Sequence, residues 1–228
     1  MTSAIIVAAG RGTRMGVNVD KLFLQVAGRP LVGHTWERFD RSPFIAEILL
    51  VVRPGMEPHF LELAEAFGTT KPFRLVAGGQ ERQHSVWNGL QALSHHCQIA
   101  LIQDGARPCT SDKIISDTIA AAQKWGAAVA AQKVTDTIKE IGENGCIARN
   151  VDRSKLWAVQ TPQVFKKEII LRAMKEVLEK NLTVTDDTAA CELIGQPVQL
   201  VESATPNPKA TAPSDLPFIE LLLKNNQR

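Results

Sequence analysis

A glycine-rich segment, with three cations in it or just beyond it, follows the first apolar run of the chain, residues 4–8. It reads Ala8-Ala9-Gly10-Arg11-Gly12-Thr13-Arg14-Met15-Gly16, and Lys21 comes shortly after it. Small residues let the backbone approach a phosphate, whose charge consecutive N–H groups and nearby cations can hold. The alternative is a strand-to-helix turn without a ligand, but such a turn gains nothing from concentrating like charge. The segment therefore predicts a phosphate-binding loop.

Two well-known phosphate loops do not match this segment. The dinucleotide pattern GxGxxG needs its third glycine one residue before Gly16, and an acidic ribose ligand should close the second strand, where Arg53 stands. The P-loop pattern needs Lys and then Ser or Thr directly after its last glycine, whereas Val17 follows Gly16. Both mismatches argue against hydride transfer and ATP hydrolysis.

A second charged group follows the apolar run of residues 99–103. It reads Asp104-Gly105-Ala106-Arg107-Pro108. The Asp104 carboxylate suits Mg²⁺ with water completing the octahedron, and it could equally accept a hydrogen bond from a substrate hydroxyl or cap the following turn. Arg107 can bind an incoming phosphate with its planar guanidinium.

Short apolar runs alternate with segments of helical periodicity along most of the chain. Uninterrupted apolar strands must be buried on both sides, so the alternation predicts an α/β fold, a Rossmann-like open and mostly parallel sheet with helices on both faces. In such a sheet ligands bind beyond the carboxyl ends of the strands, which is where both charged groups lie. The predicted strands are residues 4–8, 47–52, 73–77, 99–103, 127–131, 157–160 and 198–201. The predicted helices are residues 31–39, 57–67, 85–93, 111–125, 166–179, 187–194 and 214–223.

The alternation breaks between about residues 132 and 156. Residues 137–141 and 146–151 alternate in polarity around the turn Gly142-Glu143-Asn144-Gly145, a pattern that predicts a protruding β-hairpin arm. Repeats, low-complexity tracts and linkers are absent from the sequence. We therefore interpret residues 1–228 as one domain that carries this arm.

The composition limits the partners and the compartment. The formal charge is only +2 over 228 residues, so any cationic site must be a local cluster and nucleic acid is not an expected partner. The four cysteines form no CxxC pair, which argues against a zinc site or a disulfide framework and fits a reducing compartment. Apolar runs in the sequence are too short to span a bilayer or to form a signal peptide. We expect a cytoplasmic protein that binds no membrane.

Several blocks, taken in order, resemble the sugar-phosphate nucleotidyltransferases and, among them, the 2-C-methyl-D-erythritol 4-phosphate cytidylyltransferase family of the non-mevalonate isoprenoid pathway. The first block is AAGxGxRM at residues 8–15, with Lys21 shortly after it. The resemblance covers roughly residues 4 to 222. The further blocks are residues 78–86, 104–108, 151–153, 160–163, 185–187 and 207–211.

The resemblance implies an activity and a set of site residues. A cytidylyl group would pass from CTP to 2-C-methyl-D-erythritol 4-phosphate, a sugar-alcohol phosphate, giving 4-diphosphocytidyl-2-C-methyl-D-erythritol and pyrophosphate with Mg²⁺ as cofactor. Arg14 and Lys21 are the implied catalytic cations for the triphosphate and its transition state. The implied nucleotide-binding residues are Ala8, Ala9, Gly10, Gly12, Gly79, Ser85 and Gly105. The implied substrate-binding residues are Asp104, Arg107, Thr137, Arg153, Thr161, Thr185 and Lys209, with Asp104 also the candidate metal ligand.

The resemblance also implies a homodimer. Thr137 and Arg153 lie in the predicted arm, which in the family crosses to a partner subunit and completes the partner's site.

A few positions depart from the family pattern. Asp20 stands where proline usually precedes the lysine, so a carboxylate could partly neutralise Lys21 and the loop lacks the fixed φ of proline. Gln103 replaces a usual histidine, at a position to which we assign no chemistry. Around Lys209 the commoner neighbours, Ile before and Val after, are replaced by Pro208 and Ala210.

Three other functions stay open. A ribitol 5-phosphate cytidylyltransferase would share the glycine-rich loop and the Asp104 block but differ at residues 151–153 and 185–187. A transferase that uses another nucleotide, such as GTP or UTP, is more distant. A non-catalytic nucleotide-binding regulator would not need Arg14, Lys21, Asp104 and Arg107 together.

Overall fold

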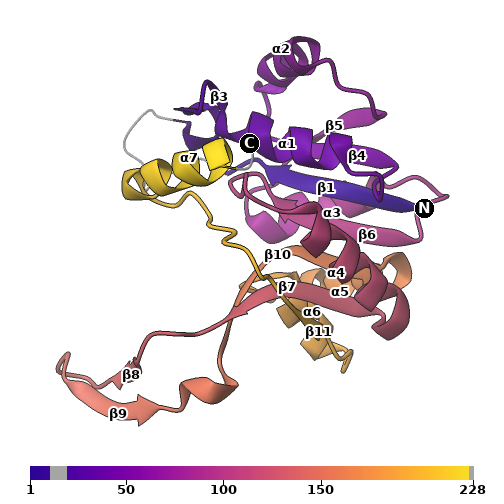
Figure 1. Cartoon of the computed structure of the whole chain (residues 1–228). Coiled ribbons are helices and arrows are strands. Elements are labelled where there is room, and N and C mark those ends of the chain that lie inside the picture. Colours follow the sequence, from indigo (N-terminus) through magenta and orange to yellow (C-terminus); the bar gives the residue numbers. More distant parts are fainter. Residues whose placement is uncertain (11–19, 226–228) are drawn as a thin grey trace.

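The computed structural model of the chain describes residues 1–10 and 20–225. Its centre is a seven-stranded sheet in the order β11-β7-β10-β6-β1-β4-β5 (Figure 1). The strands are β1 (Thr2–Ala8), β4 (Glu47–Val52), β5 (Phe73–Ala77), β6 (Ile99–Asp104), β7 (Ala127–Lys133), β10 (Trp157–Lys166) and β11 (Gln199–Glu202).

The strands of this sheet run parallel with one exception. β1 pairs in parallel with β4 and β6, β4 with β5, and β7 with β11, whereas β10 is antiparallel to both β6 and β7. The prediction of an open, mostly parallel α/β sheet is confirmed.

Strand β10 differs from its predicted extent. The prediction ended this strand at Gln160, but it continues to Lys166, and Gln163 pairs with Ile102 of β6. Proline removes a donor from a β-ladder, which is why Pro162 reads as a strand end. In the structure the register shifts between Val159 and Gln163, and the intervening Thr161–Pro162 peptide bond is cis.

Helices cover both faces of the sheet, as predicted. One face packs against α1 (Leu31–Arg41), α2 (Glu57–Phe67), α4 (Asp112–Trp125) and α7 (Leu216–Asn225). The other face packs against α3 (Arg82–Gln91), α5 (Lys167–Glu179) and α6 (Asp187–Leu193). Successive strand residues point to opposite faces, so Ala4 and Ile6 belong to the first core and Ile5 belongs to the second.

The starts of α4 and α3 match their predictions to different degrees. Helix α4 begins within one residue of its predicted start, and Ser111 caps it, because its Oγ accepts a hydrogen bond from the N–H of Ile114 at 3.3 Å. Helix α3 begins at Arg82, three residues before the predicted start at Ser85. The earlier start places Arg82 in the first turn of α3, at the carboxyl edge of the sheet.

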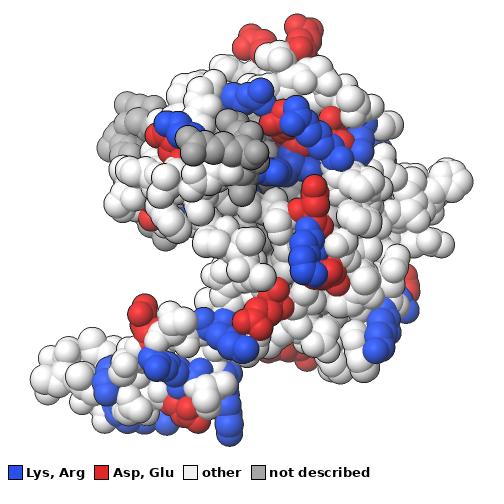
Figure 2. All heavy atoms as spheres, viewed as in Figure 1, with Lys and Arg blue, Asp and Glu red and all other residues white. Residues whose placement is uncertain are grey.

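The predicted arm is present. Strands β8 (Ile138–Ile141) and β9 (Ile147–Val151) form a separate antiparallel pair that stands away from the body (Figure 1). Figure 2 shows this arm at lower left with Lys and Arg beside Asp and Glu. At its end Ile141 and Ile147 face each other across the strands and are 71% and 67% exposed.

Short elements surround Lys21. The 3-10 helix η2 (Lys21–Phe23) is followed by a small hairpin of β2 (Gln25–Val26) and β3 (Arg29–Pro30), which the sequence patterns did not predict.

Two further short helical turns lie elsewhere in the chain. They are η3 (Arg153–Lys155), at the end of the arm's second strand, and η4 (Pro213–Asp215), before α7. Within residues 1–10 and 20–225, the helices are too short or too polar to cross a membrane.

Candidate active site

A cavity of about 630 Å³ opens at the carboxyl edge of the sheet. Segments that follow β1, β4, β5, β6 and β11 meet there, as expected for an open α/β sheet. Its lining in the described part of the chain is Val7, Ala9, Gly10, Lys21, Leu22, Arg53, Pro54, Gly78, Gly79, Gln80, Glu81, Arg82, Ser85, Asp104, Gly105, Ala106 and Lys209.

Most of the predicted nucleotide-binding residues lie at this cavity. Ala9, Gly10, Gly79, Ser85 and Gly105 line it. Ala8 is buried directly behind them, at the end of β1. Gly12 and the catalytic candidate Arg14 lie outside the described residues.

Glycine at positions 78 and 79 allows two backbone segments to approach closely. A Cβ at Gly78 would lie 2.3 Å from the Cβ of Ala9, and a Cβ at Gly79 would lie 2.3 Å from the Cβ of His84. The Ser85 hydroxyl fixes this turn, since it accepts from the N–H of Gly79 at 3.0 Å and donates to the Glu81 carbonyl at 3.2 Å. The segment after β5 therefore lies close to the end of β1 and is held in a fixed turn at the cavity.

Lys21 reaches the cavity from η2. Its Nζ donates to the carbonyl of Ala210 at 3.0 Å, which joins the loop after β1 to the segment that carries Lys209. Aimed into a cavity with several other cations, Lys21 can supply a point charge to a phosphate oxygen.

Asp20 has a structural role next to Lys21. One carboxylate oxygen accepts from the N–H of Leu22 at 3.1 Å and caps η2, while the other lies 2.9 Å from Nη2 of Arg53. The φ of Asp20 is −79°, close to the value that proline imposes. The backbone at this position is therefore compatible with the proline that the family usually carries.

Three cations surround the carboxylate of Asp104. Nζ of Lys209 lies 2.8 Å and Nε of Arg107 lies 3.6 Å from Oδ2, while Nε of Arg82 lies 3.4 Å from Oδ1. Burial by itself would raise the pKa of Asp104, but Arg82, Lys209 and Arg107 lower it to about 2. The carboxylate is therefore ionised at any physiological pH.

The lowered pKa of Asp104 predicts how the free energy of unfolding changes as the pH falls. A carboxyl whose pKa is lower in the folded than in the unfolded chain stabilises the fold above its unfolded pKa, and this contribution is lost as the pH falls toward the folded pKa. Asp104→Asn should be less stable than wild type by roughly 2 kcal/mol at pH 7. The difference should shrink as the pH falls from about 4 toward 2. Urea unfolding across this range measures it, and a difference independent of pH would contradict the assignment.

The surroundings of Asp104 do not suit a metal ion held by the protein. Across residues 1–10 and 20–225, His, Cys, Asp and Glu form no group of three that could hold one. Both oxygens of Asp104 already face cations, and a metal would have to displace Arg82 or Lys209. That Asp104 binds Mg²⁺ stays a prediction, and the geometry favours the alternative in which it positions cations or accepts from a substrate hydroxyl.

Arg107 and Thr161 lie behind Asp104 in a buried polar layer. Thr161 accepts from the backbone N–H of Asp104 at 3.1 Å through its Oγ1. Nη1 of Arg107 donates to the carbonyl of Asn207 at 2.7 Å, and the amide of Asn207 donates to the Thr161 carbonyl at 2.8 Å. These hydrogen bonds connect the segment of Lys209 to β6 and β10. Gln103 belongs to the same polar layer, because its side-chain amide donates to the hydroxyl of Thr110 at 3.0 Å and that hydroxyl donates to the side chain of Asn207 at 3.2 Å.

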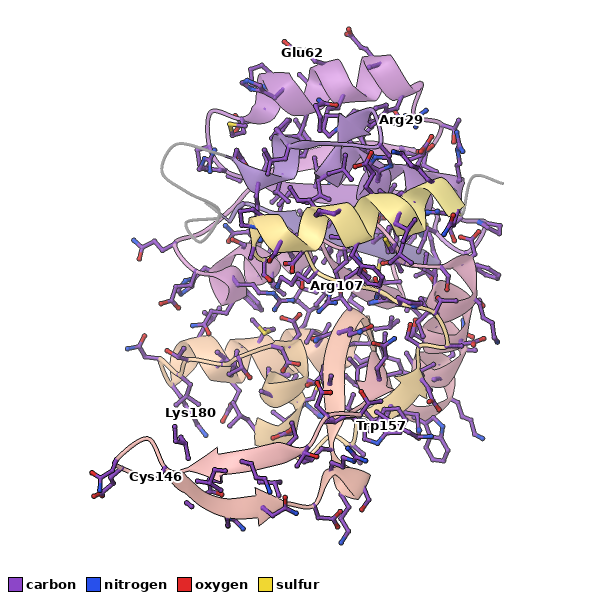
Figure 3. The ribbon with its side chains drawn as sticks, turned by 60° about the vertical axis from the view of Figure 1, so that its left-hand side comes forward. Arg29, Glu62, Arg107, Cys146, Trp157 and Lys180 are labelled. Atoms are coloured by element: carbon purple, nitrogen blue, oxygen red, sulfur yellow. The ribbon has the colours of Figure 1, made fainter. Side chains whose placement is uncertain are left out.

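The remaining predicted substrate-binding residues are not at the cavity lining formed by the described residues. Thr185 is exposed just before α6. Thr137 and Arg153 are exposed on the arm, where Arg153 donates to the carbonyl of Thr135. Figure 3 shows Arg107 within the body and Cys146 at the tip of the arm. The roles of Thr137, Arg153 and Thr185 stay predictions.

Arg53 and Arg82 line the cavity but were assigned no role from the sequence. Arg53 directly follows β4 and Arg82 begins α3 after β5, so both follow parallel strands at the edge where ligands bind. This position after a strand is the signal in the sequence that indicates a role for both arginines.

Comparison with known proteins identifies the family. The family model that describes 2-C-methyl-D-erythritol 4-phosphate cytidylyltransferase matches residues 2–225. Proteins of that name from Caldanaerobacter subterraneus and Clostridium acetobutylicum are each 43% identical to this chain, over 97% and 99% of it and 98% and 99% of their own lengths.

Solved structures agree with this result. The 4-diphosphocytidyl-2C-methyl-D-erythritol synthase of Anaerococcus prevotii is 32% identical, with a TM-score of 0.86 over 98% of this chain and 96% of its own. The 2-C-methyl-D-erythritol 4-phosphate cytidylyltransferase of Thermus thermophilus is 33% identical, with a TM-score of 0.81 over 98% and 100%. Given a match along nearly the whole chain and a cavity built from the same blocks, this chain belongs to the 2-C-methyl-D-erythritol 4-phosphate cytidylyltransferase family.

Proposed function

We propose that this protein transfers a cytidylyl group from CTP to 2-C-methyl-D-erythritol 4-phosphate and releases pyrophosphate. The observation that carries the proposal is the meeting of Lys21, Asp104 and Lys209 at one cavity, in a chain that matches the family from residue 2 to residue 225. We take residues 1–228 as a single nucleotidyltransferase domain.

The reaction brings two anions together. A phosphate oxygen of the substrate attacks the α-phosphorus of CTP, the bond from that phosphorus to the bridging oxygen breaks, and pyrophosphate leaves with the bonding electrons. Positioning and cations supply nearly all of the catalysis, without a covalent protein intermediate. Lys21 and Arg14 would stabilise charge on the triphosphate, while Lys209 would hold the substrate phosphate. Arg107, predicted from the sequence to bind that phosphate, lies behind Asp104 and would support the segment of Lys209 through its bond to the Asn207 carbonyl. A divalent cation bound by the triphosphate would draw further charge from the phosphate oxygens.

The nucleotide would lie between the loop after β1 and the segment after β5. The backbone around Gly79 and the lone pairs of Ser85 offer acceptors to the exocyclic amine of cytosine. Gly10 would leave room for the ribose and phosphates, since a Cβ at this position meets nothing within 4 Å among the described residues. Gly105 would let the backbone after β6 lie close to β1, because a Cβ there would be 3.1 Å from the carbonyl oxygen of Val7.

A second copy of the chain is the proposed partner of the arm. The edges of β8 and β9 and the exposed pair Ile141 and Ile147 would be covered in a symmetric dimer. Thr137 and Arg153 would then reach the partner's cavity, which explains why they lie outside the cavity of their own chain.

A pyrophosphate-release assay tests the activity. With Mg²⁺ present, wild-type protein should release pyrophosphate only when CTP and 2-C-methyl-D-erythritol 4-phosphate are supplied together. ATP, GTP and UTP, and ribitol 5-phosphate as the acceptor, serve as the controls. Faster turnover with ribitol 5-phosphate would move the assignment to that substrate. Tight CTP binding without turnover on either acceptor would favour a regulatory nucleotide-binding protein.

A further inference from the structure

Arg82 joins two carboxylates that come from distant parts of the chain. It begins α3 at the rim of the cavity, and its Nη1 and Nη2 donate to the two oxygens of Asp187 at 3.0 and 2.8 Å. Its Nε lies 3.4 Å from Oδ1 of Asp104. One guanidinium therefore links α3, the start of α6 and the end of β6.

Asp187 holds Arg82 in a fixed orientation. Its side chain is only 1% exposed, and its backbone N–H donates to Oε1 of Gln163 on β10 at 3.0 Å. A bidentate pair between a planar guanidinium and a carboxylate sets the direction of the other three N–H groups, including that of Nε. Although burial opposes it, the two carboxylates raise the pKa of Arg82, so the arginine stays charged.

The contact with Arg82 completes the set of cations around Asp104. Lys209 and Arg107 both approach Oδ2, and Arg82 is the cation on Oδ1 in the described part of the chain. A carboxylate held at one oxygen can rotate about its Cβ–Cγ bond, whereas one held at both oxygens cannot rotate without losing a contact. The position of Lys209, at 2.8 Å from Oδ2, therefore depends on Arg82 as well.

We propose that Arg82, fixed by Asp187, is a positioning residue that orients Asp104 and through it Lys209 toward the substrate phosphate. This inference rests on the proposed function, in which Lys209 binds that phosphate. Loss of Arg82 should weaken use of the sugar-alcohol phosphate more than use of CTP, because Lys21 is held by the backbone carbonyl of Ala210 and not through the Asp104 carboxylate. The Ala210 backbone is itself fixed by the hydrogen bond that its N–H donates to the carbonyl of Ala106 at 2.9 Å.

A role in positioning can be separated from a role in stability. Arg82→Gln alone leaves the buried Asp187 carboxylate without its cation, which should destabilise the fold. Arg82→Gln combined with Asp187→Asn removes both charges together, so much of that stability should return. The double variant still has no cation for Oδ1 of Asp104.

The test measures thermal unfolding and steady-state kinetics for both substrates in the same samples. We expect the double variant to unfold near the wild-type temperature, with kcat/KM for 2-C-methyl-D-erythritol 4-phosphate lowered about tenfold or more and KM for CTP changed less than about threefold. Arg82→Lys keeps a positive charge beside Asp187 but lacks the planar guanidinium whose Nε faces Asp104. It should therefore show the same kinetic pattern. Arg41→Lys is the matched control, since Arg41 is 75% exposed and pairs with Glu37 on α1 away from the cavity.

Wild-type kinetics in the double variant, or in Arg82→Lys should the double variant not fold, would overturn the proposal. Wild-type protein is assayed beside the variants. If it releases no pyrophosphate, the proposed function itself fails, and that result is distinct from an active enzyme that tolerates the loss of Arg82.

Discussion

Lys21→Ala should lower kcat by a factor on the order of 10² or more, because it removes a cation aimed at charge that develops on the phosphates. The lysine lies at the cavity and is held by the carbonyl of Ala210, so its ammonium is oriented before substrates bind. A preorganised charge of this kind contributes more in the transition state than in the ground state. We expect a comparable decrease in kcat for Arg14→Ala, because the family resemblance implies that Arg14 is the second catalytic cation for the triphosphate.

Steady-state kinetics with both substrates varied measures this effect. Ser85→Ala is the companion variant, since Ser85 fixes the segment after β5 through its contact with Gly79 and should act mainly on KM for CTP. Circular dichroism confirms that each variant is folded. A Lys21→Ala enzyme with near-normal kcat would show that the assigned role of Lys21 is wrong.

A mixture of two inactive variants should regain activity if subunits share their sites. Lys21 lines the cavity of its own chain, whereas Arg153 is exposed on the arm and would serve the neighbour. Lys21→Ala and Arg153→Ala should each be inactive alone. After subunit exchange, a mixed dimer carries one intact site and one site with both defects. Random exchange makes half of the dimers mixed, so activity should recover to about a quarter of the wild-type value.

The recovery depends on exchange, which differently tagged chains can demonstrate. A mixture of Lys21→Ala with Lys209→Ala, each expected to be inactive alone, is the matched control, because both residues lie at the cavity of their own chain. In that mixed dimer each site carries one defect, so no intact site forms. If tagged mixed dimers form from the first pair and remain inactive, then the arm does not complete the neighbour's site.

Much of the fold follows from local patterns in the sequence. The alternation of short apolar runs with helical segments predicted the parallel sheet, and the turn at residues 142–145 predicted the arm. Such patterns are local, because periodicity, turn residues and helix caps act within a few residues of one another. The placement of Gly10, Asp104 and Lys209 at one cavity follows from the same patterns, since each comes just after a predicted strand.

The antiparallel strand β10 was only partly predicted. Its first residues have a clear apolar pattern, but its pairing with β6 begins beyond Pro162, where a local rule ends the strand. The shift in register that accommodates the proline depends on both neighbouring strands. This pairing places Thr161 behind Asp104, which the local sequence does not indicate.

By itself the sequence determined most of the strands and helices of the central sheet and the family that the motifs resemble, and it predicted which loop binds phosphate. Only the tertiary structure decided which groups each charged side chain contacts. Arg82 pairs with Asp187, 105 residues away, and Lys21 is held by Ala210, 189 residues away. Asp20 caps η2 and pairs with Arg53, 33 residues away, a contact that its place beside Lys21 in the sequence does not indicate. The physical reason is that an ion pair forms where packing brings two side chains within a few ångströms, and the packing of α3 against the start of α6 is a property of the whole sheet and its layers.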